Sequence, residues 1–419
     1  MSSENNSCTP KLRFPGFTGE WNRCNIGEIA DVIQGFGFPD KYQGQKEGEL
    51  PFYKVGDISS AFDKGKTKIN EAANHVDYAL LPKLHAKPIP EGATIFAKIG
   101  EAIRSNKRVM TSAPCLIDNN AAAVKAGENT TDSFLYDIML QIHLADYSGG
   151  IVPSVNKSTI EAIPILLPPT LSEQEKIASC LSTIDSLISS QGQKVDALKE
   201  HKKGLMQQLF PQPGETKPRL RFPEFSGEWE EKTLGSIAKK VNLRNSKMEI
   251  TRVLTNSANA GVVDQNDYFD RSIAVKENTA NYHIVDINEF VYNPRISSAA
   301  PVGPISINKI GKGIMSPLYT IFRFHTGCVA FYEQYFQTTI WHPYLKSIAN
   351  FGARFDRMNI TSEGFFNMPL YIPSYAEQQK IAEFLSNFES LISDEETKLQ
   401  SLKDHKKGLM QQLFPTPSK

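Results

Sequence analysis

Two stretches of the chain, 170–210 and 374–414, carry apolar residues at alternating steps of four and three. This spacing places the apolar side chains on one narrow stripe of an α-helix, which is the pattern of a coiled-coil seam. We expect the seam to consist of Ile177, Leu181, Ile184, Ile188, Val195, Leu198, Leu205, Leu209, Ile381, Leu385, Phe388, Ile392, Leu399, Leu402, Leu409 and Leu413.

Both stretches begin and end with helix boundary signals. Each opens with a hydroxyl residue, Thr170 or Ser374, three positions before a glutamate, which is the spacing of a capping box. Each ends before a proline, Pro211 or Pro415, which cannot continue a helix. These signals predict two helices of ~38 residues, each ~57 Å long at about 1.5 Å per residue.

The two stretches are near copies of each other, ending in KEHKKGLMQQLFP and KDHKKGLMQQLFP. The polar breaks in the stripe also match, Gln191 with Glu395 and Lys202 with Lys406. A duplicated stripe with matched breaks favours pairing of the two helices with each other, and a two-fold relation between the copies favours an antiparallel pair. The alternative is that each helix packs on its own globular domain.

A second, shorter element is also duplicated. Residues Leu12–Trp21 read LRFPGFTGEW and residues Leu220–Trp229 read LRFPEFSGEW, and we name each of them a strap. The order along the chain is strap, globular part, helix, strap, globular part, helix. This cyclic order predicts that the two ends of the chain lie close together, as domain termini often do.

The two globular parts resemble each other only at their beginnings and ends, so a repeated scaffold holds two divergent bodies. Strand-like runs and helical stripes alternate within them, which predicts an α+β fold of two globular domains and an antiparallel coiled coil, with a pseudo-two-fold internal repeat. The strand-like runs are Leu50–Val55, Thr94–Ile99, Glu289–Tyr292, Pro304–Ile307 and Leu318–Phe324, and the helical stripes are Phe134–Tyr147 and Cys328–Ile348, followed by glycine-bearing loops at 148–150 and 351–353. The expected divisions are a strap region at 1–21, a globular domain at 22–168, a helix at 169–211, a linker and second strap at 212–229, a globular domain at 230–373 and a helix at 374–419.

Composition is that of an ordinary globular protein. The chain has 419 residues, 40% of them hydrophobic and 22% charged, and a net charge of zero. That length suits two or three domains, and the neutral balance leaves nucleic-acid binding to local patches. The five cysteines are scattered and lack a CxxC pair, which fits a reducing cytoplasm and argues against a disulfide framework or a zinc site. No apolar run approaches ~20 residues, so no membrane span is expected.

A search for catalytic motifs yields none that is complete. Gly35 and Gly37 lack the third glycine of a dinucleotide-binding loop, and Ser60 stands where a P-loop ending at 65–67 requires glycine. The chain has no Asn-Pro-Pro-aromatic or Asp-Pro-Pro-aromatic tetrapeptide of an adenine methyltransferase, and no HExxH or GxSxG sequence. We therefore expect no catalytic residues, no metal site and no cofactor in this chain.

Basic residues cluster in segments that follow predicted strands and contain Gly, Ser and Asn. Loops of this kind on a strand scaffold suit contacts to phosphates and base edges in a DNA groove. The alternative is an ordinary solvated surface. The candidate DNA-binding residues are Lys54, Lys98, Arg104, Lys107, Arg108, Lys157, Arg295, Lys312, Arg354 and Arg357.

The helices with EQEKIA and HKKGLMQQLFP, the approach GGIVPSVNKSTIEAIPILLPP to the first helix, and the opening IGEIADVIQGFGFP resemble the specificity (S) subunits of type I restriction–modification enzymes. The resemblance covers essentially the whole chain, including the two-repeat layout. The second half departs from the pattern, because FGARFDRMNITSEGFFNMPLYIP replaces the glycine-rich approach.

The resemblance implies that the domains at 22–168 and 230–373 are target recognition domains, each reading one half of a split, asymmetric site in double-stranded DNA. It implies that their strand-connecting loops and the glycine-rich loop approach the DNA. The coiled coil would set the spacer between half-sites and dock two modification (M) subunits, which use S-adenosylmethionine to methylate adenine at N6. Restriction (R) subunits would add ATP- and Mg-dependent translocation and cleavage.

Three rival interpretations remain at this level. A divergent active site hidden in a globular part would give the isolated chain methyltransferase activity. A coiled-coil adaptor for proteins would lack the steep salt dependence that phosphate contacts impose on duplex binding. A coiled-coil DNA-binding specificity subunit of a related defence system would copurify with other partners.

Overall fold

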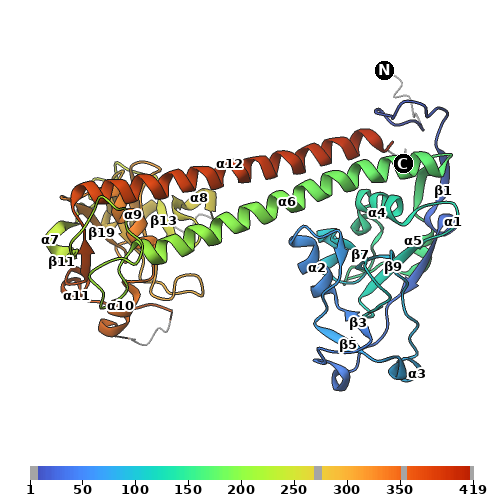
Figure 1. The fold of residues 1–419 in the computed structure, drawn as a ribbon, viewed down its shortest axis with the longest axis horizontal. Coiled ribbons are helices and arrows are strands. Elements are labelled where there is room, and N and C mark those ends of the chain that lie inside the picture. Colours follow the sequence, from blue (N-terminus) through green and yellow to red (C-terminus); the bar gives the residue numbers. More distant parts are fainter. Residues whose placement is uncertain (1–7, 269–275, 351–355, 416–419) are drawn as a thin grey trace. The chain divides into compact units, whose positions relative to one another are not determined.

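A computed structural model describes residues 8–268, 276–350 and 356–415 of the chain (Figure 1). The chain divides into two compact units, 1–196 with 394–419, and 197–393. Each unit contains an α+β globular domain and a portion of both long helices, α6 (Leu171–Leu209) and α12 (Tyr375–Leu413). The predicted fold class is confirmed.

The first globular domain is built on a five-stranded sheet in the order β2-β9-β6-β7-β4. Only β4 and β7 pair in parallel; the other neighbours are antiparallel. A three-stranded sheet β5-β3-β8 and the pair β1-β10 complete the described strands. The strands are β1 (Asn22–Asn25), β2 (Ala30–Gln34), β3 (Leu50–Tyr53), β4 (Lys68–Ile69), β5 (Asn74–Val76), β6 (Thr94–Ala97), β7 (Arg108–Thr111), β8 (Leu116–Ile117), β9 (Ala121–Ala126) and β10 (Pro164–Leu167), and the helices are α1 (Ile26–Ile29), α2 (Val55–Asp63), α3 (Leu81–Leu84), α4 (Asp132–Gln141) and α5 (Lys157–Glu161).

Both faces of the five-stranded sheet are buried, because successive side chains of a strand point to opposite faces. Phe96 and Val124 pack with α4 on one face, while Ile95 and Ala123 pack with α2 on the other. This two-sided burial explains why β6 and β9 read as nearly continuous apolar runs rather than as alternating ones.

The second globular domain has a four-stranded sheet in the order β12-β19-β16-β17 and three two-stranded pairs, β11-β20, β13-β14 and β15-β18, all antiparallel among the described residues. Aromatic side chains from β16 and β19, including Phe290 and Phe322, pack with α9 in its main core. The strands are β11 (Glu230–Thr233), β12 (Ala238–Val241), β13 (Leu254–Ser257), β14 (Gly261–Asp264), β15 (His283–Val285), β16 (Phe290–Tyr292), β17 (Ile305–Ile307), β18 (Gly313–Met315), β19 (Thr320–Phe324) and β20 (Pro369–Ile372), and the helices are α7 (Leu234–Ile237), α8 (Gln265–Tyr268), α9 (Val329–Gln337), α10 (His342–Ile348) and α11 (Ser362–Phe366).

All five predicted strand-like runs contain a strand, but the second helical stripe is not one helix. It breaks between α9 and α10, where Thr338 leaves the helical conformation and Pro343 follows at the start of α10. A proline is tolerated in the first turn of a helix and not in its interior. The first stripe likewise ends early, since α4 stops at Gln141.

Within each unit, the portions of α6 and α12 run antiparallel and side by side (Figure 1). In the first unit Asp185 accepts hydrogen bonds from Lys406, at 2.7 Å to each carboxylate oxygen, and Gln191 donates to Glu395 at 2.7 Å. In the second unit Lys202 donates to Glu389 at 2.6 Å. Partner numbers fall on α12 as they rise on α6, which defines the antiparallel direction.

The end of each long helix completes the core beside a strap. Phe414 packs edge-on against Trp21 of the first strap, with ring centroids 6.0 Å apart, and Phe210 packs against Trp229 of the second strap at 6.2 Å. The Leu12 amide also donates to the Gln412 carbonyl at 3.0 Å. These contacts place the N-terminal strap beside the end of α12, as the cyclic order of elements predicts.

Candidate nucleic-acid interface

In the first unit, backbone hydrogen bonds join two segments that are far apart in sequence. Gly149 and Ser154 exchange amide-to-carbonyl bonds of 3.3 Å and close a short loop. The Gly100 amide donates to Pro153 at 2.8 Å, and the Val155 amide donates to Lys98 at 2.9 Å. The segment after β6 and the loop before α5 are therefore joined by backbone hydrogen bonds, and we name them the paired loops.

The second unit repeats this arrangement on a different sequence. Asn350 and Asn359 exchange backbone hydrogen bonds of 3.0 and 3.1 Å. The Ile296 amide donates to Asp356, and the Met358 amide donates to Pro294, each at 3.0 Å. The segment after β16 is thus joined to the segment before α11. These two segments are the paired loops of the second unit.

The paired loops of the first unit bring several predicted DNA-binding residues together. Arg104 is 65% exposed on the segment after β6, and its ion pair with Glu101 spans 3.1 Å. Lys157, at the start of α5, is exposed and lies 3.5 Å from Glu161. Exposed ion pairs of this kind contribute about 0–1 kcal/mol, so a phosphate can displace the carboxylate at little cost.

Lys54 follows β3 and Lys98 follows β6, and both amines interact electrostatically with Asp118, which follows β8. Burial lowers the pKa of the Lys98 amine, whose Nζ donates to the Gln34 side chain. Burial also raises the pKa of the Asp118 carboxyl, an effect that the Asn120 amide and the Lys54 charge oppose. Half-buried charges with amide neighbours form a polar surface suited to hydrogen bonding with base edges.

The prediction that Arg108 lies on a basic surface segment is wrong. This residue lies in β7 and is only 1% exposed, under the ring of Phe96. Its guanidinium donates to the Ile142 carbonyl and to Asn106, each at 2.6 Å, and burial lowers its pKa to about 9. All four residues of β7 are buried because both faces of the sheet are covered, so the Arg108 side chain has no surface to offer DNA. Its neighbour Lys107 is half-buried and pairs with Asp63 at 2.5 Å.

In the second unit, the paired loops bring Arg295 and Arg357 together through a backbone bridge. Arg295 is exposed and lies 3.8 Å from Asp356. Lys312 precedes β18, outside the paired loops, and lies 3.6 Å from Asp286. Arg354 falls outside the described residues. The assignment of all these residues to DNA binding stays a prediction.

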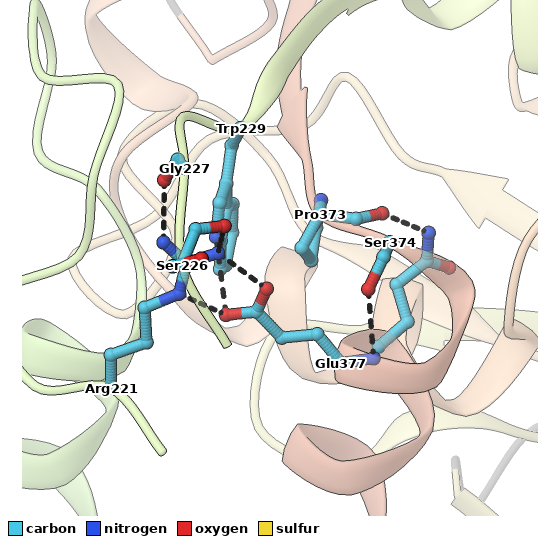
Figure 2. Close-up of polar contacts among 8 residues, drawn as sticks. Arg221, Ser226, Gly227, Trp229, Pro373, Ser374 and Glu377 are labelled. Atoms are coloured by element: carbon cyan, nitrogen blue, oxygen red, sulfur yellow. Dashed lines mark hydrogen bonds and ion pairs between the residues drawn. The ribbon is translucent and has the colours of Figure 1, made fainter. Parts of the chain in front are cut away.

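Each strap is clamped to the first turn of a long helix by one buried glutamate, for which the sequence pattern predicts only a capping role. Figure 2 shows Arg221 and Trp229 converging on the Glu377 carboxylate. Arg221 donates twice, at 2.8 and 2.7 Å, and the Trp229 indole donates at 3.3 Å. The Ser374 hydroxyl accepts from the Glu377 amide at 3.3 Å, as the cap predicts.

The first unit repeats this clamp with Arg13, Trp21 and Glu173. Arg13 donates to both carboxylate oxygens at 2.8 Å, and the Thr170 hydroxyl caps the Glu173 amide at 3.3 Å. The sequence does contain a signal for this ion pair, since an arginine is duplicated in the two straps and a glutamate in the two helices. A buried carboxylate requires a partner, and the duplicated arginine is the candidate.

All sixteen predicted seam side chains are buried or half-buried. The polar breaks between them are satisfied across the two helices. Glu395, with 4% of its side chain exposed, accepts from Gln191 and pairs with Lys194 at 3.0 Å and Lys398 at 2.9 Å. The bonds from Gln191 and the two lysines lower the pKa of Glu395 to about 2.

Among the helices that the structure describes, none has an apolar stretch long enough to cross a bilayer. Within the residues that the structure describes, no group of three or more His, Cys, Asp or Glu side chains is placed to hold a metal ion.

Comparison with known proteins finds a matching family model, relatives of similar sequence and solved structures of similar fold. The family profile described as "Type I restriction modification DNA specificity domain" matches twice, at residues 18–200 and 226–404. A Methanocaldococcus jannaschii protein named as the MjaX specificity subunit of a type I restriction enzyme is 25% identical over 277 residues, covering 62% of this chain and 60% of that protein. The MjaVIII specificity subunit of the same organism is 44% identical over 59 residues, 14% of each chain.

Among solved structures, the S subunit of a type I restriction–modification system from M. genitalium has the same fold. The TM-score is 0.55 at 12% identity, and the alignment covers 98% of this chain and 100% of that one. The two profile matches span most of the sequence, one in each half. The chain therefore belongs to the family of type I restriction–modification DNA specificity domains.

Proposed function

We propose that this chain is the DNA specificity subunit of a type I restriction–modification complex, and that each globular domain reads one half of a bipartite, asymmetric DNA site. The observation that carries the proposal is the recurrence of the paired loops in both units on unrelated sequences. One scaffold that presents different side chains twice is suited to reading two different half-sites.

The long helices are proposed to set the spacer between half-sites and to dock two M subunits. Their seam is closed by residues of this chain, which leaves the outer faces of α6 and α12 for partner proteins. Adenine-N6 methylation, with S-adenosylmethionine, belongs in this proposal to the M subunits, and cleavage, with ATP and Mg, to R subunits. The chain itself contributes specificity and architecture and no catalytic residue.

Exchange of one globular domain tests the proposal. The segment 22–168 is replaced by the corresponding domain of another family member, and the methylated sequences in host DNA are read before and after. We expect one half-site to change and the other to persist. A change at both half-sites would contradict independent reading by the two domains.

Point substitutions provide a finer version of this test. Lys54→Ala should weaken discrimination at one half-site, and Arg357→Ala should weaken it at the other, because the two residues lie in different units. The comparison uses methylation rates on duplexes that carry a single base change in either half-site. Equal effects of both variants on both half-sites would argue for a shared reading surface.

The second candidate is a DNA-binding specificity subunit of a related defence system with other partners. It shares the paired loops and differs in what binds the outer faces of the helices. Purification of the tagged chain from its host, followed by identification of the bound proteins, separates the two. Copurification of an adenine methyltransferase and a translocase supports the type I assignment.

A further inference from the structure

The closed loop of the first unit carries two branched aliphatic side chains at its tip. Ile151 is fully exposed and Val152 is 60% exposed, and Tyr147 just before the loop is 40% exposed. The residues from 147 to 155 contain no charged side chain. Exposed apolar side chains gathered on one loop are a candidate binding surface.

The backbone holds this tip in place. Gly149 and Ser154 close the loop with two hydrogen bonds, and Gly150, at φ 91°, makes the turn that a residue with a side chain rarely adopts. The Pro153 carbonyl accepts from Gly100, so the tip is fastened to the segment after β6. A fastened tip loses little conformational entropy when it is buried against a partner.

Cationic residues lie near the base of the tip, and two of them, Arg104 and Lys157, have carboxylate partners in exposed ion pairs. Lys98 and Val155 share a backbone hydrogen bond, Arg104 lies four residues beyond Gly100, and Lys157 begins α5 directly after the loop. This arrangement complements duplex DNA, in which negatively charged phosphates border each groove. The base edges lie inside the groove, and thymine presents an apolar methyl group there.

We propose that the Ile151–Val152 tip enters a groove of duplex DNA and makes apolar contact with bases, while Arg104 and Lys157 bind the flanking phosphates. This inference rests on the proposed function and adds the chemistry of one reading element. Two kinds of base surface fit a branched aliphatic tip, the methyl groups of thymine in the major groove and a partly unstacked base step in the minor groove.

The test uses the full-length chain in complex with its M subunits and the duplex identified by methylation sequencing. The double variant Ile151→Ser/Val152→Ser is compared with Ile287→Ser, which removes an isoleucine that is 56% exposed in the second unit. The double variant should bind the duplex roughly ten- to a hundredfold more weakly, the factor expected when one or two branched aliphatic side chains stay unburied. The Ile287→Ser control should bind like the wild type.

Salt dependence separates apolar from phosphate contacts. The slope of log affinity against log salt should be unchanged in the double variant, because no phosphate contact is lost. In Arg104→Ala/Lys157→Ala it should become shallower by about 0.9 for each lost contact. A shallower slope in the tip variant would overturn the apolar assignment.

Two modified duplexes identify the base surface. Replacing thymine by uracil in the half-site removes the C5 methyl groups and should reproduce the loss if the tip contacts them. A 2-aminopurine reporter should brighten in the wild-type complex, and not in the variant, if the tip unstacks a base step. Either signature supports the inference, and a loss of affinity with neither signature overturns base contact.

Three further outcomes also decide against the inference. Undiminished DNA affinity of the tip variant overturns it while leaving the proposed function intact. Loss of M-subunit binding in a pull-down, with DNA affinity retained by the variant chain, assigns the tip to a protein partner. Absence of specific DNA binding by the wild-type complex overturns the proposed function and this inference together.

Discussion

At the scale of the residue, burial separates side chains that look alike in the sequence. Arg104 and Arg108 belong to one basic segment, yet the first is 65% exposed and the second is 1% exposed. Arg104→Ala should weaken DNA binding and leave the melting temperature (Tm) within about 2 °C of the wild type, as expected for an exposed position.

Arg108→Ala should act on stability. It leaves a cavity beside Phe96 and removes the donor to the Ile142 carbonyl, a loss of about 2 kcal/mol that corresponds to roughly 4–8 °C in a unit of this size. Thermal unfolding and duplex binding are measured on both variants. A fully stable Arg108→Ala protein with impaired binding would restore the surface role.

Asp137 is a buried carboxyl in α4, 3% exposed, at the position where the second unit has Gln334. The two positions correspond because Trp21–Phe134 and Trp229–Phe331 form matching edge-on pairs. Burial raises the pKa of Asp137 well above its usual value, with Asp185 adding to the effect and Lys406 opposing it. Folding therefore favours the protonated carboxyl.

The raised pKa of Asp137 makes the stability of the folded protein depend on pH. A group whose pKa is raised on folding costs stability as pH rises from its unfolded pKa, near 3.9, through its folded pKa. Asp137→Asn should therefore raise Tm at pH 8 by roughly 2–4 °C, the shift for about 1 kcal/mol, and by less at pH 5. A Tm gain that is independent of pH would show that Asp137 does not titrate differently in the folded protein.

At the scale of the element, the paired helices place two repeat-equivalent residues, Gln191 and Glu395, in contact with each other. A neutral amide opposite a carboxylate satisfies both groups, whereas two carboxylates in this slot would repel each other. Gln191→Glu should lower Tm at pH 7 by roughly 2–4 °C or more. Part of the loss should return toward pH 5, where one carboxyl of the pair takes up a proton.

The exchanged protein, Gln191→Glu with Glu395→Gln, is the matched control. Because Lys194 and Lys398 are also repeat-equivalent, the new glutamate meets the same two cations in exchanged roles. The exchange should recover most of the lost Tm. Additive losses in a double-mutant cycle would show that the slot does not depend on this pairing.

At the scale of the whole molecule, the proposed spacer function connects helix length to DNA. One heptad added to both helices, at the Gln191 and Glu395 slots, keeps the seam in register and adds ~10 Å at about 1.5 Å per residue. The preferred gap between half-sites should grow by roughly three base pairs, since successive pairs lie about 3.4 Å apart. Binding to duplexes with graded spacers measures the optimum, and an unchanged optimum would assign the spacing to another element.

A heptad in only one helix is the control for that insertion. It moves Glu395 away from Gln191 and Lys194 and opposite an apolar seam position, which leaves a buried charge without its partners on α6. The single insertion should be less stable than the double insertion in thermal unfolding. Equal stability would mean that the seam tolerates a change of register.

The sequence alone predicts the features that repeat or are periodic. The heptad stripe, the caps at Thr170 and Ser374, the duplicated straps and the α+β class all follow from local spacing and self-similarity. These properties are visible in one dimension, because helix and strand periods depend on neighbours a few positions away. The candidate basic segments are visible for the same reason.

Tertiary structure alone shows which distant segments meet. The loop closed by Gly149 and Ser154 is fastened to Gly100 across some fifty positions, and Glu173 binds Arg13 at a separation of 160 residues. No local pattern specifies such pairings. Packing over the whole domain likewise buries Arg108 and leaves Ile151 in water, because side-chain exposure depends on everything packed around a position and not on its residue type.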